Sequence, residues 1–329
     1  MTRSRLAFVG IGWIGRSRME SVVKAGAAEA VVVCDSDEET AAKAAAEVGC
    51  QQIETSFEAV LDHDVDGVVL ATPSALHAGQ ALACLERGKA VFCQKPLART
   101  TAETEAIVDM AERRNVLLGV DFSYRRVEAF AAARAAARSG RLGSVYALDL
   151  VFHNAYGPDK GWFLDPALSG GGCVIDLGTH LVDLAITTLE DEPLSVSANL
   201  FAGGERIVEA TDRVEDYAVA ELTMANGQVV RIACSWFLPI GRDAVIEAHI
   251  YGSRAAASVR NVHGSFYDFV ASLYDGRSTT TLATPPDDWG GRALIDWARA
   301  LETGAGFECE VRSSISVART VDRIYGRLP

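Results

Sequence analysis

The chain has 329 residues, of which 49% are hydrophobic and 23% charged, and its 31 basic and 44 acidic residues leave a net charge of −13. This composition excludes an intrinsically disordered chain, which would combine low hydrophobicity with high net charge. An acidic chain without long basic runs also makes a poor nucleic-acid binder, because that affinity depends on Lys and Arg contacts to phosphates. The length suggests two domains, at about 150 residues per domain.

We expect neither a membrane partner nor a secretion signal. The negative charge disfavours anionic membrane surfaces, and no apolar run approaches the roughly 18–20 residues that span a bilayer. Residues 1–9 are basic and then apolar, but glycines interrupt the apolar stretch and no small-residue cleavage site follows. The cysteines are scattered without a C-x-x-C pair, so neither a zinc site nor a disulfide framework is expected. We therefore predict a cytoplasmic protein.

The first 122 residues alternate short apolar strands with Ala-rich helices. Such alternation indicates a parallel sheet that is covered by helices on both faces. Right-handed crossovers then produce a doubly wound Rossmann sheet. The predicted strands are 6–9, 30–34, 65–71, 90–93 and 116–120, and the predicted helices are 15–25, 37–48, 75–87 and 101–114.

The rhythm changes in the remaining segment, 123–329. Between Leu194 and Leu282 the chain has strand-like alternation, and Asn226-Gly227 between two such runs is typical of a hairpin turn. Helices followed by a run of strands indicate an α+β domain with a large, mostly antiparallel sheet. The predicted domains are 1–122 and 123–329, and the predicted elements of the second are helices 127–139, 174–189, 292–302 and 313–323 and a strand at 145–152.

A glycine motif, Gly10-x-Gly12-x-x-Gly15, follows the first predicted strand and opens the first helix. In a dinucleotide-binding turn the first glycine permits the tight turn, the second lets the backbone approach a pyrophosphate, and the third lets helix and strand pack closely. The helix N-terminus also attracts phosphate. We therefore predict that this loop, with Trp13 and Ile14, binds the cofactor, although a purely structural glycine turn stays an alternative.

Asp35 ends the second strand, at the position where an acid can hydrogen-bond the ribose hydroxyls of the adenosine. Its carboxylate would repel a 2′-phosphate, and residues 36–39, which begin with Ser36, contain no Arg or Lys to receive one. The sequence therefore favours NAD over NADP, with Arg16 as the residue that could still reach such a phosphate.

Two further stretches end the third and fourth strands: Thr72-Pro73 with His77, and Gln94-Lys95-Pro96. Ligands of open α/β sheets bind outside the C-terminal strand ends, so we expect the nicotinamide there. Pro96 keeps Lys95 out of the helical region of backbone conformation. A solvated lysine and an ordinary polar histidine in the first turn of a helix are the alternatives.

The segment Gly170-Gly171-Gly172 leads to Asp176 and His180. Residues four apart share one face of an α-helix, and a histidine near a carboxylate suits proton transfer. The three glycines allow close approach of a ligand or another backbone. One alternative is that His180 is a core histidine on a capped helix. Another is a metal site formed by Asp176, His180 and Asp183, but no further clustered ligands support it, and we predict no bound metal.

Taken together and in this order, these four features resemble the glucose–fructose oxidoreductase and inositol dehydrogenase (Gfo/Idh/MocA) family over essentially the whole chain. The resemblance implies a Rossmann domain followed by a substrate domain with a large open sheet, which often mediates dimer or tetramer contacts. It also implies Lys95, Asp176 and His180 as catalytic residues. Most members carry Glu where this chain has Gln94, which removes a charge next to Lys95.

The resemblance implies an NAD-dependent oxidoreductase that transfers a hydride between nicotinamide and a carbon of a sugar, polyol or inositol. Two alternatives are an enzyme that retains NAD and uses transient oxidation, as in glycosidase or epimerase chemistry, and a non-catalytic sensor of NAD and sugar. Substrate contacts would come from the catalytic residues and from Arg125, Arg126, Tyr156 and Trp162, unless these four are ordinary surface or core residues.

Overall fold

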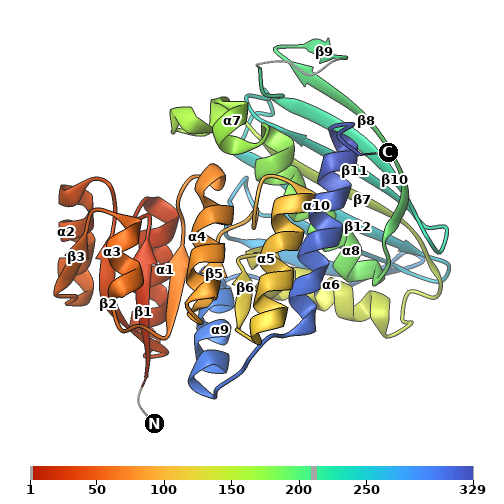
Figure 1. The fold of residues 1–329 in the computed structure, drawn as a ribbon. Helices are drawn as coiled ribbons and strands as arrows, with labels where there is room; N and C mark the ends of the chain where they lie inside the picture. The colour runs from red at the N-terminus through yellow and green to blue at the C-terminus, as the bar shows by residue number, and fades with distance from the viewer. Residues whose placement is uncertain (1–2, 209–212, 329) are drawn as a thin grey trace. The chain divides into compact units, whose positions relative to one another are not determined.

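The computed structural model describes residues 3–208 and 213–328, and its internal contacts divide the chain into two compact units (Figure 1). The N-terminal unit comprises Met1–Ser123 and Asp288–Ile315. The C-terminal unit comprises Tyr124–Asp287 and Ser316–Pro329. Residues 288–315 therefore group with the N-terminal unit, whereas the sequence suggested a single division after residue 122.

The N-terminal unit is built on a parallel sheet with the strand order β3-β2-β1-β4-β5-β6. This arrangement confirms the doubly wound Rossmann sheet predicted from the alternation of strands and helices. Because the strands are parallel, the loops that follow β1, β4, β5 and β6 all leave from the same edge. The strands are β1 (Ser4–Val9), β2 (Ala28–Cys34), β3 (Gln52–Glu54), β4 (Gly67–Leu70), β5 (Ala90–Cys93) and β6 (Leu118–Val120).

Helices cover both faces of this sheet. On one face, apolar side chains of α3, α4 and α5 pack against alternate strand residues such as Val9 and Leu70. On the other face, α1, α2 and α9 pack against Leu6, Phe8 and Phe92. The helices are α1 (Trp13–Lys24), α2 (Glu38–Val48), α3 (Phe57–Asp62), α4 (Ser74–Glu86), α5 (Thr101–Arg114) and α9 (Arg292–Glu302), with a short 3₁₀ helix η4 (Cys309–Arg312).

The sequence did not predict the short elements β3 and α3, and the helix α9, which is distant in the chain, also packs on this sheet. β3 has three residues and α3 has six, which is too short for a hydrophobic period to show. The helix α9 was predicted with its observed bounds, but its packing on this sheet was not. Gly67 and Gly119 make room for it, because a Cβ on either would lie 2.7 Å or 2.6 Å from the ring of Trp297.

The C-terminal unit contains a sheet of nine strands in the order β15-β14-β13-β12-β7-β11-β10-β8-β9. Among the described strands of this sheet, only β7 and β11 pair parallel, which confirms the prediction of a mostly antiparallel sheet. The predicted hairpin is also present, since β10 pairs antiparallel with β11 and Gly227 has φ +88°. The strands are β7 (Val145–Asn154), β8 (Pro193–Ala202), β9 (Glu205–Ile207), β10 (Tyr217–Met224), β11 (Val229–Ser235), β12 (Ala244–Gly252), β13 (Ala256–Asn261), β14 (Phe269–Asp275) and β15 (Ser278–Ala283).

Helices α6 and α8 lie against this sheet, α6 over β12 to β15 and α8 over β7 and β11. Burial alternates along β10 and β11, so one side of these strands faces the core and the other side is more exposed. The helical elements are η1 (Ser123–Arg126), α6 (Glu128–Arg138), η2 (Gly161–Leu164), α7 (Pro166–Ser169), η3 (Val174–Gly178), α8 (Thr179–Leu189) and α10 (Ser313–Ile324).

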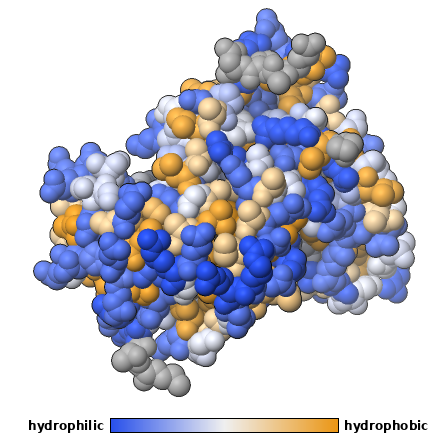
Figure 2. All heavy atoms as spheres, in the orientation of Figure 1, coloured by the Kyte–Doolittle hydropathy of each residue, from blue (hydrophilic) through white to orange (hydrophobic). Residues whose placement is uncertain are grey.

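One helical stretch of the described residues, 166–189, is long and apolar enough to match a membrane span, although sequence inspection had excluded such a run; 83% of its most apolar window is buried inside the protein. On the face drawn in Figure 2, hydrophilic residues surround scattered apolar ones.

All seven cysteines are free thiols, and only Cys309 is exposed. Burial raises the pKa of Cys34 to about 11, which keeps that thiol protonated.

Candidate functional site

The glycine loop has the geometry of a dinucleotide-binding turn. Gly10 adopts φ +84°, and a Cβ on Gly15 would lie only 2.0 Å from the carbonyl oxygen of Gly10. Gly12 differs, because a Cβ there would meet nothing within 4 Å. Two glycines are therefore required by close contacts within the protein, whereas the third opens onto free space at the N-terminus of α1. That is the position where a pyrophosphate would need the backbone to be accessible.

Asp35 holds this loop in place from the end of β2. Its carboxylate accepts hydrogen bonds from the backbone N–H of Ile11 at 2.7 Å and from that of Asp37 at 3.1 Å. Each carboxylate oxygen can accept a second hydrogen bond, so the residue can still receive ribose hydroxyls. Arg16, in contrast, forms ion pairs with Glu20 at 3.0 Å and with Glu47, and these partners compete with any phosphate for its guanidinium.

The glycine loop generates a matched pair of predictions. Gly12→Ala should fold normally, because its φ of −65° suits any residue and the space around it is open, but it should weaken NAD⁺ binding about tenfold or more. Gly15→Ala should lower the melting temperature clearly, because its Cβ would collide with backbone. Thermal melts and fluorescence titration with NAD⁺ test both; equal behaviour of the two variants would contradict the division of roles.

His77 connects the two predicted strand-end stretches. Its Nδ1 lies 2.8 Å from the carbonyl oxygen of Pro96, and its Nε2 lies 2.8 Å from that of Thr72. Burial lowers the pKa of His77, while the two carbonyl oxygens act against that shift. The ring is 1% exposed, so it lies beneath the surface and links the loops after β4 and β5. His77 therefore supports the predicted cofactor edge from below rather than presenting a ring nitrogen to a ligand.

The segment after β5 contains Gln94, Lys95 and a cis peptide bond between Lys95 and Pro96. Gln94 is buried and donates a hydrogen bond from its side-chain amide to Asp121, at 2.7 Å. Arg18 of α1 donates to the same carboxylate at 2.6 Å. Sequence reasoning missed Arg18 and Asp121, since neither belongs to a motif. Lys95 itself is half-buried.

In the C-terminal unit, Asp176 lies in a π-helical turn, η3, that continues into α8 at Thr179. The predicted helix 174–189 is present, but its first turn is wider than the α-helix assumed from the sequence. The hydroxyl of Thr179 donates to the carbonyl oxygen of Ile175 at 2.8 Å, a side-chain bond that competes with regular α-helical pairing. Single π turns of this kind are frequent at functional sites.

Glu215 holds the chain at the start of this turn, and sequence reasoning missed it. Its buried carboxylate accepts from the backbone N–H of Val174 at 2.8 Å, from that of Gly172 at 3.0 Å and from the hydroxyl of Tyr325 at 2.7 Å. The glycines are needed for this approach, since a Cβ on Gly172 would lie 2.0 Å from the carbonyl oxygen of Glu215. The triplet therefore accommodates another backbone, one of the two possibilities that the sequence left open.

Burial raises the pKa of Glu215 above its usual 4.5. When the pKa of a carboxyl group is higher in the folded protein than in the unfolded chain, its contribution to stability is complete at a pH below the unfolded-state pKa. That contribution is lost as the pH rises through the folded-state pKa. The stability advantage of the natural protein over Glu215→Gln, about 1–3 kcal/mol, should therefore shrink as the pH rises above the usual 4.5. Urea unfolding of both proteins measures it, and an advantage that grows with pH would contradict this assignment.

An aromatic series leads from Trp162 to Asp176. Trp162 stacks on Phe163 with ring centroids 3.8 Å apart, and Phe163 meets the edge of Trp236 at 6.4 Å. The indole N–H of Trp236 donates to Asp176 at 3.2 Å. The structure thus connects two residues that sequence reasoning had assigned to the substrate region.

His180 lies on α8, 7% exposed, and packs edge-on against Tyr124 with ring centroids 4.8 Å apart. Burial raises the pKa of Tyr124, and the charge of Asp176 adds to the shift. The phenol therefore stays protonated beside the imidazole.

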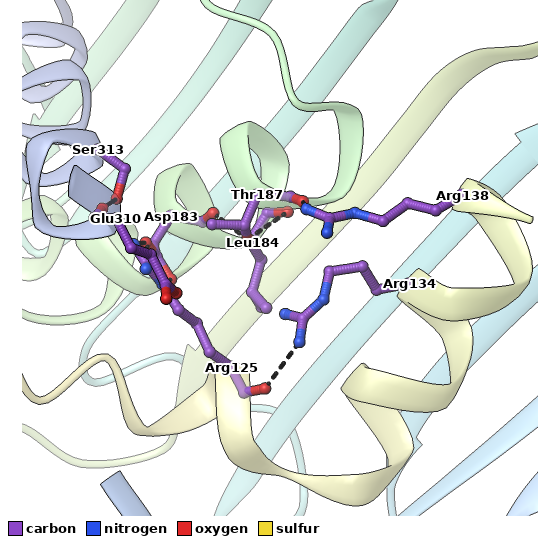
Figure 3. A network of polar contacts seen from close by, with 8 residues as sticks. All are labelled: Arg125, Arg134, Arg138, Asp183, Leu184, Thr187, Glu310 and Ser313. Carbon is purple, nitrogen blue, oxygen red and sulfur yellow. Dashed lines mark hydrogen bonds and ion pairs between the residues drawn. The ribbon is translucent and has the colours of Figure 1, made fainter. Parts of the chain in front are cut away.

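Arg125 is engaged in a buried ion pair with Asp183, as Figure 3 shows. Its Nε lies 2.9 Å from both carboxylate oxygens, and Arg134 donates to its carbonyl oxygen at 3.0 Å. This contact of one guanidinium with both carboxylate oxygens holds α8 at Asp183, one turn after His180. Arg125 therefore positions the helix. It also occupies the carboxylate that a metal site would have required, and the described residues contain no group of three or more metal-ligating side chains.

The other residues predicted to contact the cofactor or the substrate differ in their exposure. Trp13 is 71% exposed at the start of α1, and Tyr156 is 50% exposed in the loop after β7. Ser36 and Arg126 are exposed, while Ile14, Thr72 and Pro73 are partly buried.

Comparison with known proteins agrees with this architecture. Residues 4–122 match the model of an oxidoreductase family with an NAD-binding Rossmann fold, and residues 130–258 match the GFO/IDH/MocA C-terminal domain. The chain is 31% identical over 302 residues to 1,5-anhydro-D-fructose reductase of Ensifer adhaerens, covering 91% of this chain and 88% of that protein. It is 30% identical over 326 residues to D-xylose 1-dehydrogenase (NADP(+)) 2 of Haloferax volcanii, covering 96% and 95%.

Among solved structures, levoglucosan dehydrogenase in complex with NADH and L-sorbose superposes with a TM-score of 0.85 over 99% of this chain and 96% of that one, at 23% identity. That similarity supports the fold. The fold and the glycine loop define an oxidoreductase with an NAD-binding Rossmann domain. The chain belongs to the Gfo/Idh/MocA family of oxidoreductases.

Proposed function

We propose that this protein transfers a hydride between NAD(H) and a hydroxyl or carbonyl carbon of a sugar, polyol or inositol. The observation that carries the proposal is the glycine loop, in which Gly12 opens onto free space while Gly10 and Gly15 are closed by backbone. The relatives named above act, by their names, on carbohydrates or carbohydrate derivatives, which supports the substrate class.

The residues of this chain would hold the cofactor through Gly12 and the N–H groups at the start of α1, with Asp35 on the ribose. The proposed contacts along the same edge come from Thr72, Pro73, Gln94 and Lys95. The bound nicotinamide ring supplies the hydride chemistry.

In the proposed mechanism, His180 takes the proton of the reacting hydroxyl as general base. The ammonium of Lys95 donates a hydrogen bond to the same oxygen and stabilises the negative charge that develops on it. Asp176, which Trp236 holds in place, orients substrate hydroxyls or the His180 ring. In the reductive direction His180 returns the proton. Tyr156 and Trp162 supply aromatic surface on the substrate side.

Removal of either proposed catalytic group should reduce turnover while the cofactor still binds. We expect Lys95→Ala and His180→Ala each to lower kcat about 100-fold or more, with the NAD⁺ dissociation constant changed far less. Release of NADH into solution, recorded with D-xylose, levoglucosan, myo-inositol and related polyols, provides the assay. Lys24→Ala, an exposed lysine at the end of α1, is the matched control. Near-normal turnover of both variants with intact NAD⁺ binding would disprove these roles.

We propose NAD rather than NADP as the cofactor. The carboxylate of Asp35 disfavours a 2′-phosphate, and Glu20 and Glu47 compete with such a phosphate for the guanidinium of Arg16. The Haloferax relative is named for NADP(+). The preference for NAD is therefore argued from the residues of this chain and not from the family.

Asp35→Asn should therefore raise the ratio of kcat/KM for NADP⁺ over NAD⁺ about tenfold, because it removes the repulsive charge and keeps an acceptor for the Ile11 N–H. Steady-state kinetics with both cofactors measure the ratio. Asp62→Asn removes the same charge from an exposed position on α3 and should leave the ratio unchanged; an equal rise in that control would attribute the effect to net charge alone.

We further propose a cytoplasmic homodimer or homotetramer that associates through the C-terminal sheet. The exposed apolar side chain of Val219 on β10, on the sheet face away from the core, supports the sheet as the contact. The free thiols suit a reducing compartment. Analytical ultracentrifugation should show a mass at least twice the 35.1 kDa of one chain.

A further inference from the structure

The carboxylate of Asp121 is shared by two buried donors from separate elements. Its Oδ2 accepts from Arg18 Nε at 2.6 Å and from Gln94 Nε2 at 2.7 Å. The three residues are 5%, 1% and 8% exposed for Arg18, Asp121 and Gln94. They belong to α1 and to the ends of β6 and β5, so this cluster ties a helix to the carboxyl edge of the sheet.

The chemistry of the cluster fixes the orientation of the Gln94 side chain. A carboxylate accepts hydrogen bonds only, so the amide must present its NH₂ group to Asp121. The side-chain carbonyl oxygen of Gln94 is the other atom of the amide group, so it must point away from Asp121. The contact therefore positions the residue that immediately precedes Lys95, while His77 holds the same segment on its other side through the carbonyl oxygen of Pro96.

The charge of the cluster explains why residue 94 is an amide. Arg18 and Asp121 form a neutral ion pair, which a neutral Gln94 completes. A glutamate at position 94, which the family resemblance leads one to expect, would place a second carboxylate within about 3 Å of the first, where two carboxylates cannot both ionise readily. The negative charge of this site is therefore on Asp121, and Gln94 is its matching donor.

We propose that Asp121, held by Arg18, is a positioning residue that fixes Gln94 and thereby the Gln94–Lys95 segment for cofactor binding and turnover. This inference rests on the proposed function, since it assigns the segment to the cofactor edge. It adds that positions 94 and 121 act as a pair, in which the effect of changing one residue depends on the residue at the other position.

A double-mutant cycle tests the pair on the full chain. We expect Q94E to weaken NAD⁺ binding about tenfold because of carboxylate repulsion, and D121N to do so because Arg18 is left buried without its counter-charge. The double variant Q94E/D121N keeps one carboxylate beside Arg18 and removes the repulsion between two, so its loss of NAD⁺ affinity should be clearly smaller than the sum of the two single losses. Q51E, at an exposed glutamine of the same unit, is the matched control.

The pH dependence separates positioning from a merely structural role. Lowering the pH should restore NAD⁺ binding to Q94E, because protonation of one carboxylate removes the repulsion, whereas binding to D121N should not recover. If D121N does not fold, Q94M decides: it removes the amide without adding charge, and binding should be weaker in Q94E than in Q94M at neutral pH. Equal weakening in these two variants would refute the charge argument.

The remaining outcomes are also decisive. Additive effects in the cycle, or a Q94E variant with natural NAD⁺ affinity and melting temperature, would overturn the pairing. Coupling in the melting temperature without any change in NAD⁺ affinity or kcat would overturn the positioning role. Failure of the natural protein itself to bind NAD⁺ would instead refute the proposed function, so that titration is performed first.

Discussion

The parallel direction of β1, β4, β5 and β6 is the constraint on which the N-terminal unit depends. Because these neighbouring strands run the same way, Gly10, Thr72, Gln94 and Asp121 all follow a strand at the same edge of one sheet. The edge is then reinforced from within the unit: Asp35 holds the glycine loop, His77 links the loops after β4 and β5, and Asp121 links β5 and β6 to α1. The segment 94–96 is thus fixed by these side-chain contacts in addition to the backbone hydrogen bond from the Gln94 N–H to the carbonyl oxygen of Leu70, at 2.9 Å.

Buried carboxylates recur at the places where the structure needs exact placement of the chain. Asp121 is matched by Arg18, Asp183 by the guanidinium fork of Arg125, and Glu215 by two backbone N–H groups and the Tyr325 hydroxyl. A buried charge without such partners would destabilise the folded protein. Each of these carboxylates therefore requires its donors to stay at hydrogen-bonding distance, which fixes the local conformation. In the C-terminal unit, Glu215 holds the start of the π turn at Val174, and Arg125 holds the helix after His180 through Asp183.

Sequence reasoning succeeded where a local rule and the tertiary fold agree. The helix Thr101–Arg114 has the predicted bounds, with the Thr100 hydroxyl capping its start and Asn115 in the left-handed conformation at its end. At the start of α2, the Asp37 side chain accepts a hydrogen bond from the Thr40 N–H and caps the helix. The glycine loop succeeded for the same reason, since a positive φ and two short backbone contacts leave little choice of residue. The first turn of helix 174–189 deviated because the Thr179 hydroxyl and the Glu215 carboxylate, both outside the hydrophobic pattern, take part in its hydrogen bonding.

By itself the sequence determined the fold class, the tight glycine turn before α1 and the family, because those features lie in short, contiguous patterns of strand, glycine and helix. Only the tertiary structure decided that Arg125 is committed to Asp183, that His77 is a buried link, and that Asp121 and Glu215 hold the candidate site. Each of these assignments depends on at least one contact between residues 19 or more positions apart. Such pairs leave no periodicity in the chain, because the partners are brought together by strand order and helix packing.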